Sequence, residues 1–269
     1  MKTSPHVRET ILKWYRTLPF SEAYDAEFFY ALDTVFVDEA WTVETYDTKC
    51  KNGKQNLLAY LYFLDAMQAR YEEKGIPEEI FLDSAGDVVR WCDAWSRTKG
   101  ELYLGELNWL RSSYTLKLFK LGRLQFCHAK TKYELPQYDL HPKDPVLEIH
   151  IPASGPLDPE ECKKSIAMAR EFFPRYYPEK TFKCFTCHSW LLDPTHGEIM
   201  REGSNILAFA KLFDVVGKDE SDSLLGYIFR WGIQRSELEG VTPTTSLAVA
   251  VKETALKGRT FYAGIGIIV

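Results

Sequence analysis

The sequence predicts an α+β protein with layered α/β elements, in which a mainly helical first part precedes a part that mixes strands and helices. Apolar residues recur at helical spacing through most of the stretch from Arg8 to Arg111. From Val146 onwards, strand patterns alternate with helical patterns. At 269 residues the chain is longer than one typical domain, so we expect two.

The first part is expected to form a series of helices. Their expected ranges are Arg8 to Thr17, Ala23 to Val35, Gln55 to Lys74, Glu78 to Thr98 and Gly105 to about Arg111. Gly75 and Pro77 separate the third helix from the fourth, because glycine commonly ends helices and proline commonly starts them. The segment from Tyr114 to His128 fits both a helix and a strand, with Gly122 as the expected point of change.

A polar stretch without periodicity runs from Lys130 to Pro145 and marks the expected domain boundary. We therefore expect one domain over residues 1–129 and another over residues 130–269. The second domain should begin with a strand from Val146 to Ile151 and a helix from Asp158 to about Phe173. Asp158 and Glu161 have the spacing of a capping box at the start of that helix.

The remaining segments complete the second part. A strand is expected from Phe182 to Trp190, and Asp193 is expected to cap the turn after it. Later segments are expected as follows: a strand or helix over Asn205 to Phe213, a strand or short helix over Leu224 to Ile233, a helix over Ser246 to Lys257, and a strand over Phe261 to Val269.

Composition excludes several classes of protein. The 33 Lys and Arg against 38 Asp and Glu give a net charge of -5, so no nucleic-acid partner is expected. The first residues lack the apolar core of a secretory signal, which predicts a cytoplasmic protein. The longest apolar stretches are shorter than the roughly 20 residues that cross a bilayer, so no membrane partner is expected. The six cysteines are expected to be reduced thiols.

Five stretches carry a resemblance to a known family. They are L-E-I-H-I-P-A-S-G-P-L-D-P-E-E-C at 147–162, C-H-S-W-L-L-D-P at 187–194, G-S-N-I-L at 203–207, G-E-L-Y-L-G-E-L at 100–107 and L-F-K-L-G-R-L-Q-F at 118–126. They resemble bacterial GNAT-like acyltransferases, which pair a helical N-terminal acyltransferase domain with a GNAT-like C-terminal domain. The resemblance implies a mixed sheet in the second part, acyl-CoA or acetyl-CoA as co-substrate, and acyl transfer to a small-molecule amine.

One loop departs from the pattern of that family. Typical GNAT enzymes hold the pyrophosphate of CoA with a loop written Q/R-x-x-G-x-G/A, at the positive end of a helix. The equivalent segment here, Ala153 to Asp158, has one glycine, no Arg or Gln, and a proline that lacks an N–H. Carboxylates at Asp158, Glu160 and Glu161 oppose a second anion. If acyl-CoA binds, we expect another part of the chain to hold its phosphates.

Three residues are candidates for catalysis. Glu148 and His150 share one face of their strand, because side chains alternate with period two. If the two strands are neighbours, His188 lies close to His150 near the carboxyl ends, where open α/β sheets bind ligands. Glu148 or His150 would then take the proton of an amine. The alternative is a polar network that only orients this edge of the sheet.

Further candidates concern substrate binding. Ser204 and Asn205 follow a glycine and offer donors to a ligand, although the same residues are ordinary in turns. Arg123 and Arg230 stand in apolar contexts and suit a carboxylate or phosphate, with structural ion pairs as the alternative. Tyr262 is a further candidate acid, by loose analogy with GNAT enzymes.

Cys184, Cys187 and His188 spell C-x-x-C-H, a pattern of haem attachment in exported proteins. Inside an expected strand of a chain without an export signal, plain strand structure is preferred, and neither haem nor metal is expected. Alternation puts Cys187 and His188 on opposite faces, which argues against a nucleophile and base pair and favours Cys187 as core. The sequence thus favours a GNAT-like N-acyltransferase. The alternative is a GNAT-derived protein that binds or senses a small molecule without catalysis.

Overall fold

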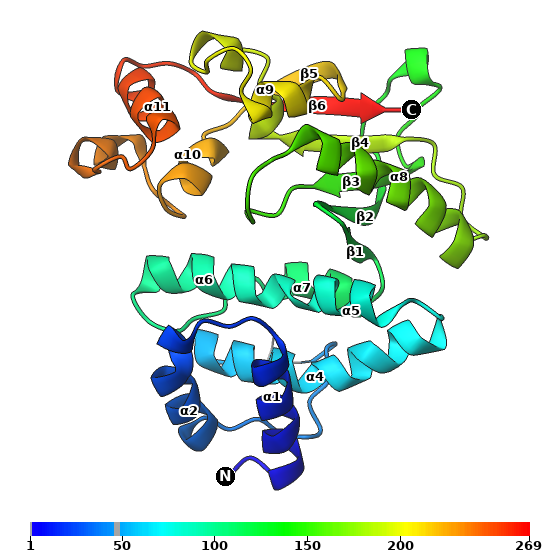
Figure 1. The fold of residues 1–269 in the computed structure, drawn as a ribbon, viewed down its shortest axis with the longest axis vertical. Coiled ribbons are helices and arrows are strands. Elements are labelled where there is room, and N and C mark those ends of the chain that lie inside the picture. Colours follow the sequence, from blue (N-terminus) through cyan, green and yellow to red (C-terminus); the bar gives the residue numbers. More distant parts are fainter. Residues whose placement is uncertain (1, 46–48) are drawn as a thin grey trace. The chain divides into compact units, whose positions relative to one another are not determined.

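The computed structural model describes residues 2–45 and 49–269, which form two compact units, Met1–Lys120 and Leu121–Val269 (Figure 1). The first unit is mainly helical and the second contains most of a mixed six-stranded sheet, whose first strand, Leu118–Leu121, begins in the first unit, so the α+β class is confirmed. The boundary between the two units, after Lys120, lies earlier in the sequence than the boundary expected after residue 129. The reason is that strand β2, Leu124–Lys130, pairs with the second unit's β3.

The described helices of the first unit follow the expected apolar pattern closely. They are α1 Pro5–Thr17, α2 Asp25–Thr34, α4 Gly53–Glu73, α5 Glu78–Ala85, α6 Asp87–Lys99 and α7 Leu107–Tyr114. Ser4 and Asn52 cap α1 and α4, because their side chains accept from the backbone N–H groups of Val7 and Gln55. The single helix expected from Glu78 to Thr98 is wrong, since Gly86 separates α5 from α6.

The sheet of the second unit has the order β1-β2-β3-β4-β6-β5. Its strands are β1 Leu118–Leu121, β2 Leu124–Lys130, β3 Pro145–His150, β4 Phe185–Ser189, β5 Asp214–Glu220 and β6 Tyr262–Ile268. The pair β3/β4 is parallel, whereas β2/β3, β4/β6 and β5/β6 are antiparallel. The parallel pair is joined by the helix α8, Pro159–Tyr176, as a parallel crossover requires.

The ambiguous segment from Tyr114 to His128 becomes the two strands β1 and β2. Gly122 turns the chain between them at a φ of 64°, a conformation that other residues rarely adopt. A Cβ at this position would also lie 2.8 Å from Ser165 Oγ of α8. Both backbone strain and space therefore require glycine here, and the strand pattern prevails over the helical one.

Helix α8 covers one face of the sheet (Figure 1). Phe173 of α8 contacts Phe126 of β2 at 6.5 Å and Phe182 at 5.5 Å between ring centroids. Asp158 caps α8, as expected, by accepting from the N–H groups of Glu160 and Glu161. The helix continues to Tyr176 in spite of Pro174.

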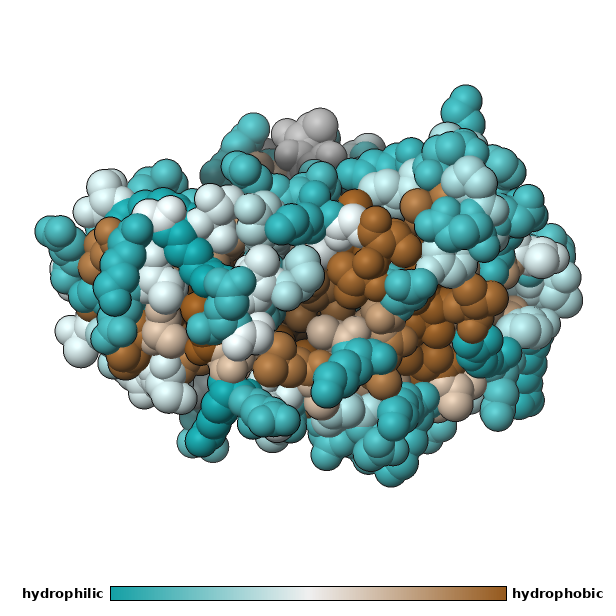
Figure 2. Space-filling view, turned by 90° about the horizontal axis from the view of Figure 1, so that it is seen from above, coloured by the Kyte–Doolittle hydropathy of each residue, from teal (hydrophilic) through white to brown (hydrophobic). Residues whose placement is uncertain are grey.

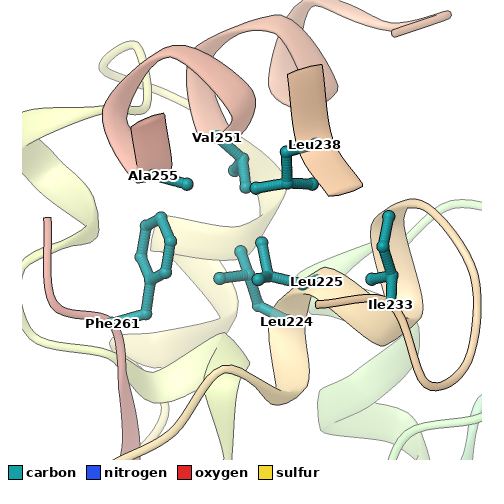
Figure 3. Close-up of a cluster of buried hydrophobic side chains, with 7 residues drawn as sticks. All are labelled: Leu224, Leu225, Ile233, Leu238, Val251, Ala255 and Phe261. Carbon is teal, nitrogen blue, oxygen red and sulfur yellow. The ribbon is translucent and has the colours of Figure 1, made fainter. Parts of the chain in front are cut away.

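The connection from β5 to β6 forms a small helical lobe with its own core (Figure 3). It contains α10 Ser223–Ile228 and α11 Ser246–Leu256, while the short α9, Asn205–Ala210, precedes β5. The buried core of the lobe is made of Leu224, Leu225, Ile233, Leu238, Val251, Ala255 and Phe261. The lobe is thus tied to the start of β6 through Phe261.

Figure 2 shows hydrophobic residues gathered in patches among hydrophilic ones on the face seen there. The large hydrophobic side chains exposed on the lobe include Tyr227 of α10 and both Val249 and Leu256 of α11. None of the helices in the described parts of the chain combines the length and the apolar character needed to cross a bilayer.

Candidate active site

Glu148, His150 and His188 lie on one face of the sheet, the face opposite α8. Strand alternation places Leu147 and Phe185 on the α8 side, so Glu148 and Thr186, which are paired in register, point the other way. His150 and His188 each follow two residues later on the same face. Glu148 and His150 are half-buried, and the structure brings the three candidate catalytic residues to one place.

Each histidine of this face contacts a carboxylate. His150 Nε2 lies 3.4 Å from Glu148 Oε2, within strand β3. His188 Nε2 lies 3.3 Å from Asp219 Oδ2 of β5. Because β6 separates β4 from β5, this second contact crosses a whole strand. The sequence predicted no strand at 214–220, so Asp219 was not recognised as a site residue.

The imidazole of His150 beside Glu148 lowers the pKa of that carboxyl, and His188 and Lys132 act in the same direction. Burial opposes this shift without overcoming it. Glu148 is therefore a carboxylate at neutral pH. A carboxylate of lowered pKa is a weak proton acceptor. The shift therefore argues against Glu148 as the base.

The pairing between the parallel strands β3 and β4 ends beside the candidate catalytic residues. Their register holds for Leu147 with Phe185 and for Glu148 with Thr186, and in the described chain no later pair follows. Both strands nevertheless continue, β3 to His150 and β4 to Ser189. Beyond Glu148 and Thr186 the two strand ends are thus not paired in register, which suits an extended ligand between them.

Two residues of β2 and one residue of the segment after it extend the site beyond the sequence prediction. Gln125 pairs in register with His150, and its Nε2 atom is buried without a partner among the residues described. Cys127 pairs in register with Glu148. Burial raises the pKa of Tyr133, and Asp219 contributes in the same direction, so the phenol carries its proton at neutral pH. A polar glutamine within an apolar strand was the one signal available in the sequence.

Arg123 organises the loop between β3 and α8. Its guanidinium donates to the carbonyl oxygens of Pro156 at 2.9 Å, Pro152 at 3.0 Å and Gly155 at 3.5 Å. Gly155 has a φ of 65°, and no described residue outside its chain neighbours lies within 4 Å of a Cβ placed there. The loop is therefore held from one side by Arg123 and is open beside Gly155.

The other candidate binding residues, Ser204, Asn205 and Arg230, contribute to local structure. Ser204 caps α9 by accepting from the N–H of Leu207, and Asn205 is the exposed first residue of that helix. Arg230 pairs with Glu237 in the helical lobe. Neither of these two contacts links Ser204 or Arg230 to Glu148, His150 or His188. The structure places them outside the cluster on the sheet.

The C-x-x-C-H segment lies in strand β4 except for Cys184, which directly precedes the strand. Cys187 is buried, and burial raises the pKa of its thiol. Within residues 2–45 and 49–269, His, Cys, Asp and Glu side chains form no group of three arranged to bind a metal. Asp193 accepts from both the N–H and the hydroxyl of Thr195 and from the N–H of Tyr262, which gives it a turn-forming role. Tyr262 pairs with Glu220 in the sheet, on the face away from His188.

Comparison with known proteins assigns the family. Residues 118–268 match the GNAT-like C-terminal domain, and residues 4–116 match the N-acyltransferase N-terminal domain. The first match covers more than half of the chain. The protein therefore belongs to the family of GNAT-like acyltransferases in which these two domains are joined.

Solved structures agree with this assignment. A crystal structure of an acyltransferase in complex with decanoyl-CoA is 30% identical with a TM-score of 0.70, over 79% of this chain and 65% of that chain. A structure of an acyltransferase with decanoyl-CoA and teicoplanin is 24% identical with a TM-score of 0.79, over 97% and 87% of the two chains. An acyltransferase mutant with octanoyl-CoA is 23% identical with a TM-score of 0.79, over 100% and 88%. The last two show the shared fold. No curated protein matches the chain.

Proposed function

We propose that this protein transfers an acyl group from acyl-CoA to the nitrogen of an amine. The observation that carries the proposal is the convergence of Glu148 with His150, and of Asp219 with His188, where β3 and β4 part. Two imidazoles, each beside a carboxylate, supply proton acceptors at a place where an extended ligand can lie between strands. Support also comes from the solved relative that contains decanoyl-CoA.

The reaction requires one proton to be removed and one to be supplied. The amine nitrogen attacks the thioester carbon, forming the C–N bond, and the C–S bond then breaks to release the thiolate of CoA. His150 or His188 takes the proton that the amine loses, with Glu148 and Asp219 holding the two rings. Tyr133, which is protonated at neutral pH, is the candidate donor to the leaving thiolate.

The loop after β3 offers limited support for the phosphates of CoA. The backbone N–H groups of Gly155 and Leu157 donate no hydrogen bond in the described chain, and the space beside Gly155 is open. The N–H groups of Glu160 and Glu161 are already taken by Asp158. Fewer donors are therefore left than a free helix start provides.

This last observation favours a second candidate function, in which the protein binds or senses a small molecule without acyl transfer. Asp158 satisfies the start of α8 internally, and Glu160 and Glu161 add negative charge there. These carboxylates disfavour a pyrophosphate at this helix start. The two candidates differ in whether acyl-CoA binds and turns over.

Two measurements separate the candidates. Thermal unfolding with acetyl-, octanoyl- or decanoyl-CoA detects binding, because a ligand that binds only the folded state raises the melting temperature. Release of the CoA thiol in the presence of an amine then detects transfer. We propose a small-molecule amine as acceptor; the panel also includes teicoplanin, since a solved relative is in complex with it. A melting temperature unchanged by every acyl-CoA would overturn the enzyme proposal.

If turnover is found, the role of the histidines can be tested. Replacing His150 or His188 with Gln removes a proton acceptor while keeping hydrogen-bonding capacity. Turnover should fall by about 100-fold or more for the base and less for the other histidine. Exposed His141, which pairs with Glu134 away from the cluster, provides the control His141→Gln. If all three variants turn over at the rate of the wild type, neither His150 nor His188 acts in catalysis.

A further inference from the structure

One histidine outside the candidate active site is almost completely buried. His196 begins a short 3₁₀ helix, His196–Glu198, in the turn that follows β4, and only 2% of the residue is exposed. Its ring lies edge-to-face on the ring of Trp190, with 5.8 Å between the centroids and 77° between the planes. Burial of an imidazole favours its neutral form, and the candidate mechanism makes no use of this histidine.

Hydrogen bonding fixes which nitrogen of this ring carries the proton. The Nε2 atom of His196 lies 2.6 Å from the backbone oxygen of Trp190, and a carbonyl oxygen only accepts, so Nε2 is the donor. The Nδ1 atom of the neutral ring is then unprotonated, and it is buried without a hydrogen-bond partner among the described residues. A second proton would bind at this Nδ1 atom, where none of those residues accepts its hydrogen bond.

Three charged side chains surround the turn that holds this ring. Arg259, in the segment before β6, donates to the backbone oxygen of Thr195 at 2.8 Å and pairs with Glu198 at 2.8 Å. Its guanidinium thus binds residues on both sides of His196 in the sequence. Asp193 lies at the start of the turn, and its carboxylate already accepts three hydrogen bonds. A proton on His196 would therefore add a buried positive charge close to an arginine.

These surroundings lower the pKa of His196 below its ordinary value of 6.5. Burial makes the largest contribution, and the positive charge of Arg259 acts in the same direction. The charge of Asp193 and the hydrogen bond to the backbone oxygen of Trp190 oppose the shift without overcoming it. His196 is therefore neutral at neutral pH.

The same turn supports the helical lobe, whose core is drawn in Figure 3. Trp190 and Ile199 pack against this core, and the ring of Trp190 also contacts that of Tyr227 in α10, with 6.2 Å between the centroids. The backbone oxygen of His196 accepts from the N–H groups of Ile199 and Met200. A displacement of the His196 ring would therefore disturb two residues on which the lobe packs.

From this arrangement we propose that His196 is a pH switch: the neutral ring holds the lobe, residues 221–261, on the end of β4, and the protonated ring loosens it. The lobe loosens because a buried imidazolium close to Arg259 gains an N–H without an acceptor. By linkage, a histidine whose pKa is lower in the folded state stabilises the fold above its unfolded pKa of about 6.5. This contribution is lost as the pH falls below that value. The switch does not depend on acyl transfer.

Hydrogen exchange of the full chain, followed by mass spectrometry, tests the switch. Exchange in α10 and α11 is compared with exchange in α8 between about pH 7.5 and about pH 5.5, after correction for the intrinsic rates. With a histidine of pKa about 6.5 in the open state, one proton makes opening up to about tenfold more frequent at pH 5.5. We expect exchange of the lobe to increase towards this limit and exchange of α8 to stay unchanged. Exchange of the lobe that is independent of pH would overturn the inference.

Variants identify the group that takes the proton. His196→Gln keeps a hydrogen-bond donor but cannot be protonated, so the additional exchange at the lower pH should disappear. His141→Gln, at an exposed histidine paired with Glu134, is the matched control and should keep the additional exchange. If the additional exchange persists in His196→Gln and disappears in His150→Gln or His188→Gln, another histidine controls the lobe and the inference is wrong.

An NMR titration of the wild type keeps the inference testable even if the His196 variant does not fold. The signal of His196 among the six histidines is assigned by its proximity to the ring of Trp190. We expect this signal to titrate below about pH 6.5. The signal of His141 should titrate above that of His196, because Glu134 raises the pKa of His141. Titration of His196 at or above about pH 6.5 would overturn the inference.

Discussion

His188 Nε2 and Asp219 Oδ2 lie 3.3 Å apart although their strands, β4 and β5, do not pair with each other. Strand β6 lies between them, and Ile265 of β6 pairs with both His188 and Gly217. Asp219, two residues beyond Gly217, therefore points to the same face as His188. Asp219, which is far from His188 in the sequence, thus orients the imidazole of His188 across an intervening strand.

The first prediction concerns this contact. Asp219→Asn keeps the shape of the side chain and removes its charge. We expect kcat/KM for the amine to fall by roughly 10-fold, less than the loss of about 100-fold expected for His188→Gln, because Asp219 acts through the imidazole. The pH profile of kcat/KM should also shift in the Asp219 variant. The control is Lys218→Gln, which changes the neighbouring residue on the opposite face of the sheet. If the pH profile of the Asp219 variant is identical to that of the wild type, Asp219 does not act as a positioning residue.

The second prediction concerns the pH dependence of stability. The pKa of Glu148 is lowered from 4.5 in the folded state, chiefly by its hydrogen bond with His150. A lowered pKa means that the carboxylate stabilises the fold above its unfolded pKa and that this contribution is lost as the pH falls through the folded pKa. The difference in free energy of unfolding between wild type and Glu148→Gln should therefore shrink below about pH 4.5. Urea denaturation at several pH values measures it, and a difference that grows on acidification would contradict the shift.

The third prediction concerns alkylation. Cys127 is half-buried and faces Glu148 in register, whereas Cys187 is buried with a raised thiol pKa. Iodoacetamide should therefore modify Cys127 before Cys187, and the added group should block the site and lower turnover. Cys127→Ser should keep activity and resist inactivation. Cys50 is the other half-buried thiol, so Cys50→Ser is the control. If the Cys50 variant resists inactivation by iodoacetamide as well as the Cys127 variant does, inactivation does not proceed through Cys127.

The fourth prediction concerns the helical lobe. Val251 and Val249 lie on the same helix, but Val251 is 0% exposed and Val249 is 40% exposed. Val251→Ala should destabilise the protein by about 2 kcal/mol, since it removes buried methyl groups and leaves a cavity. Val249→Ala should change the free energy of unfolding by less than about 0.5 kcal/mol. Equal effects of the two variants in urea denaturation would show that the lobe does not pack as in Figure 3.

The fifth prediction concerns Arg123. Arg123→Ala removes donors to three carbonyl oxygens of the loop between β3 and α8 and should cost about 1–3 kcal/mol of stability. The loosened loop should also raise KM for acyl-CoA more than it lowers kcat. Arg230→Ala removes an exposed pair with Glu237 and should change neither quantity measurably. An unchanged KM in the Arg123 variant would separate the loop from acyl-CoA binding.

The sequence alone determined the class of fold and most elements, because periodicity is a local property of the chain. The strand Pro145–His150 and the helix Pro159–Tyr176 were expected from their pattern and from the cap at Asp158. The resemblance in residues 147–162 pointed to the family that the comparisons then confirmed. The pairing of Glu148 with His150 on one face also followed from strand alternation alone.

Only the tertiary structure decided which distant residues meet. The register of β3 with β4 places His188 near Glu148, and the strand order places Asp219 beside His188. The hairpin at Gly122 and the break at Gly86 were decided by packing and backbone conformation that periodicity does not describe. The contacts of Arg123, a candidate for ligand binding, with carbonyl oxygens of the loop after β3 were likewise visible only in the structure. Patterns in a sequence fix the face on which a side chain lies, whereas its partners depend on register, strand order and packing between segments far apart in the chain.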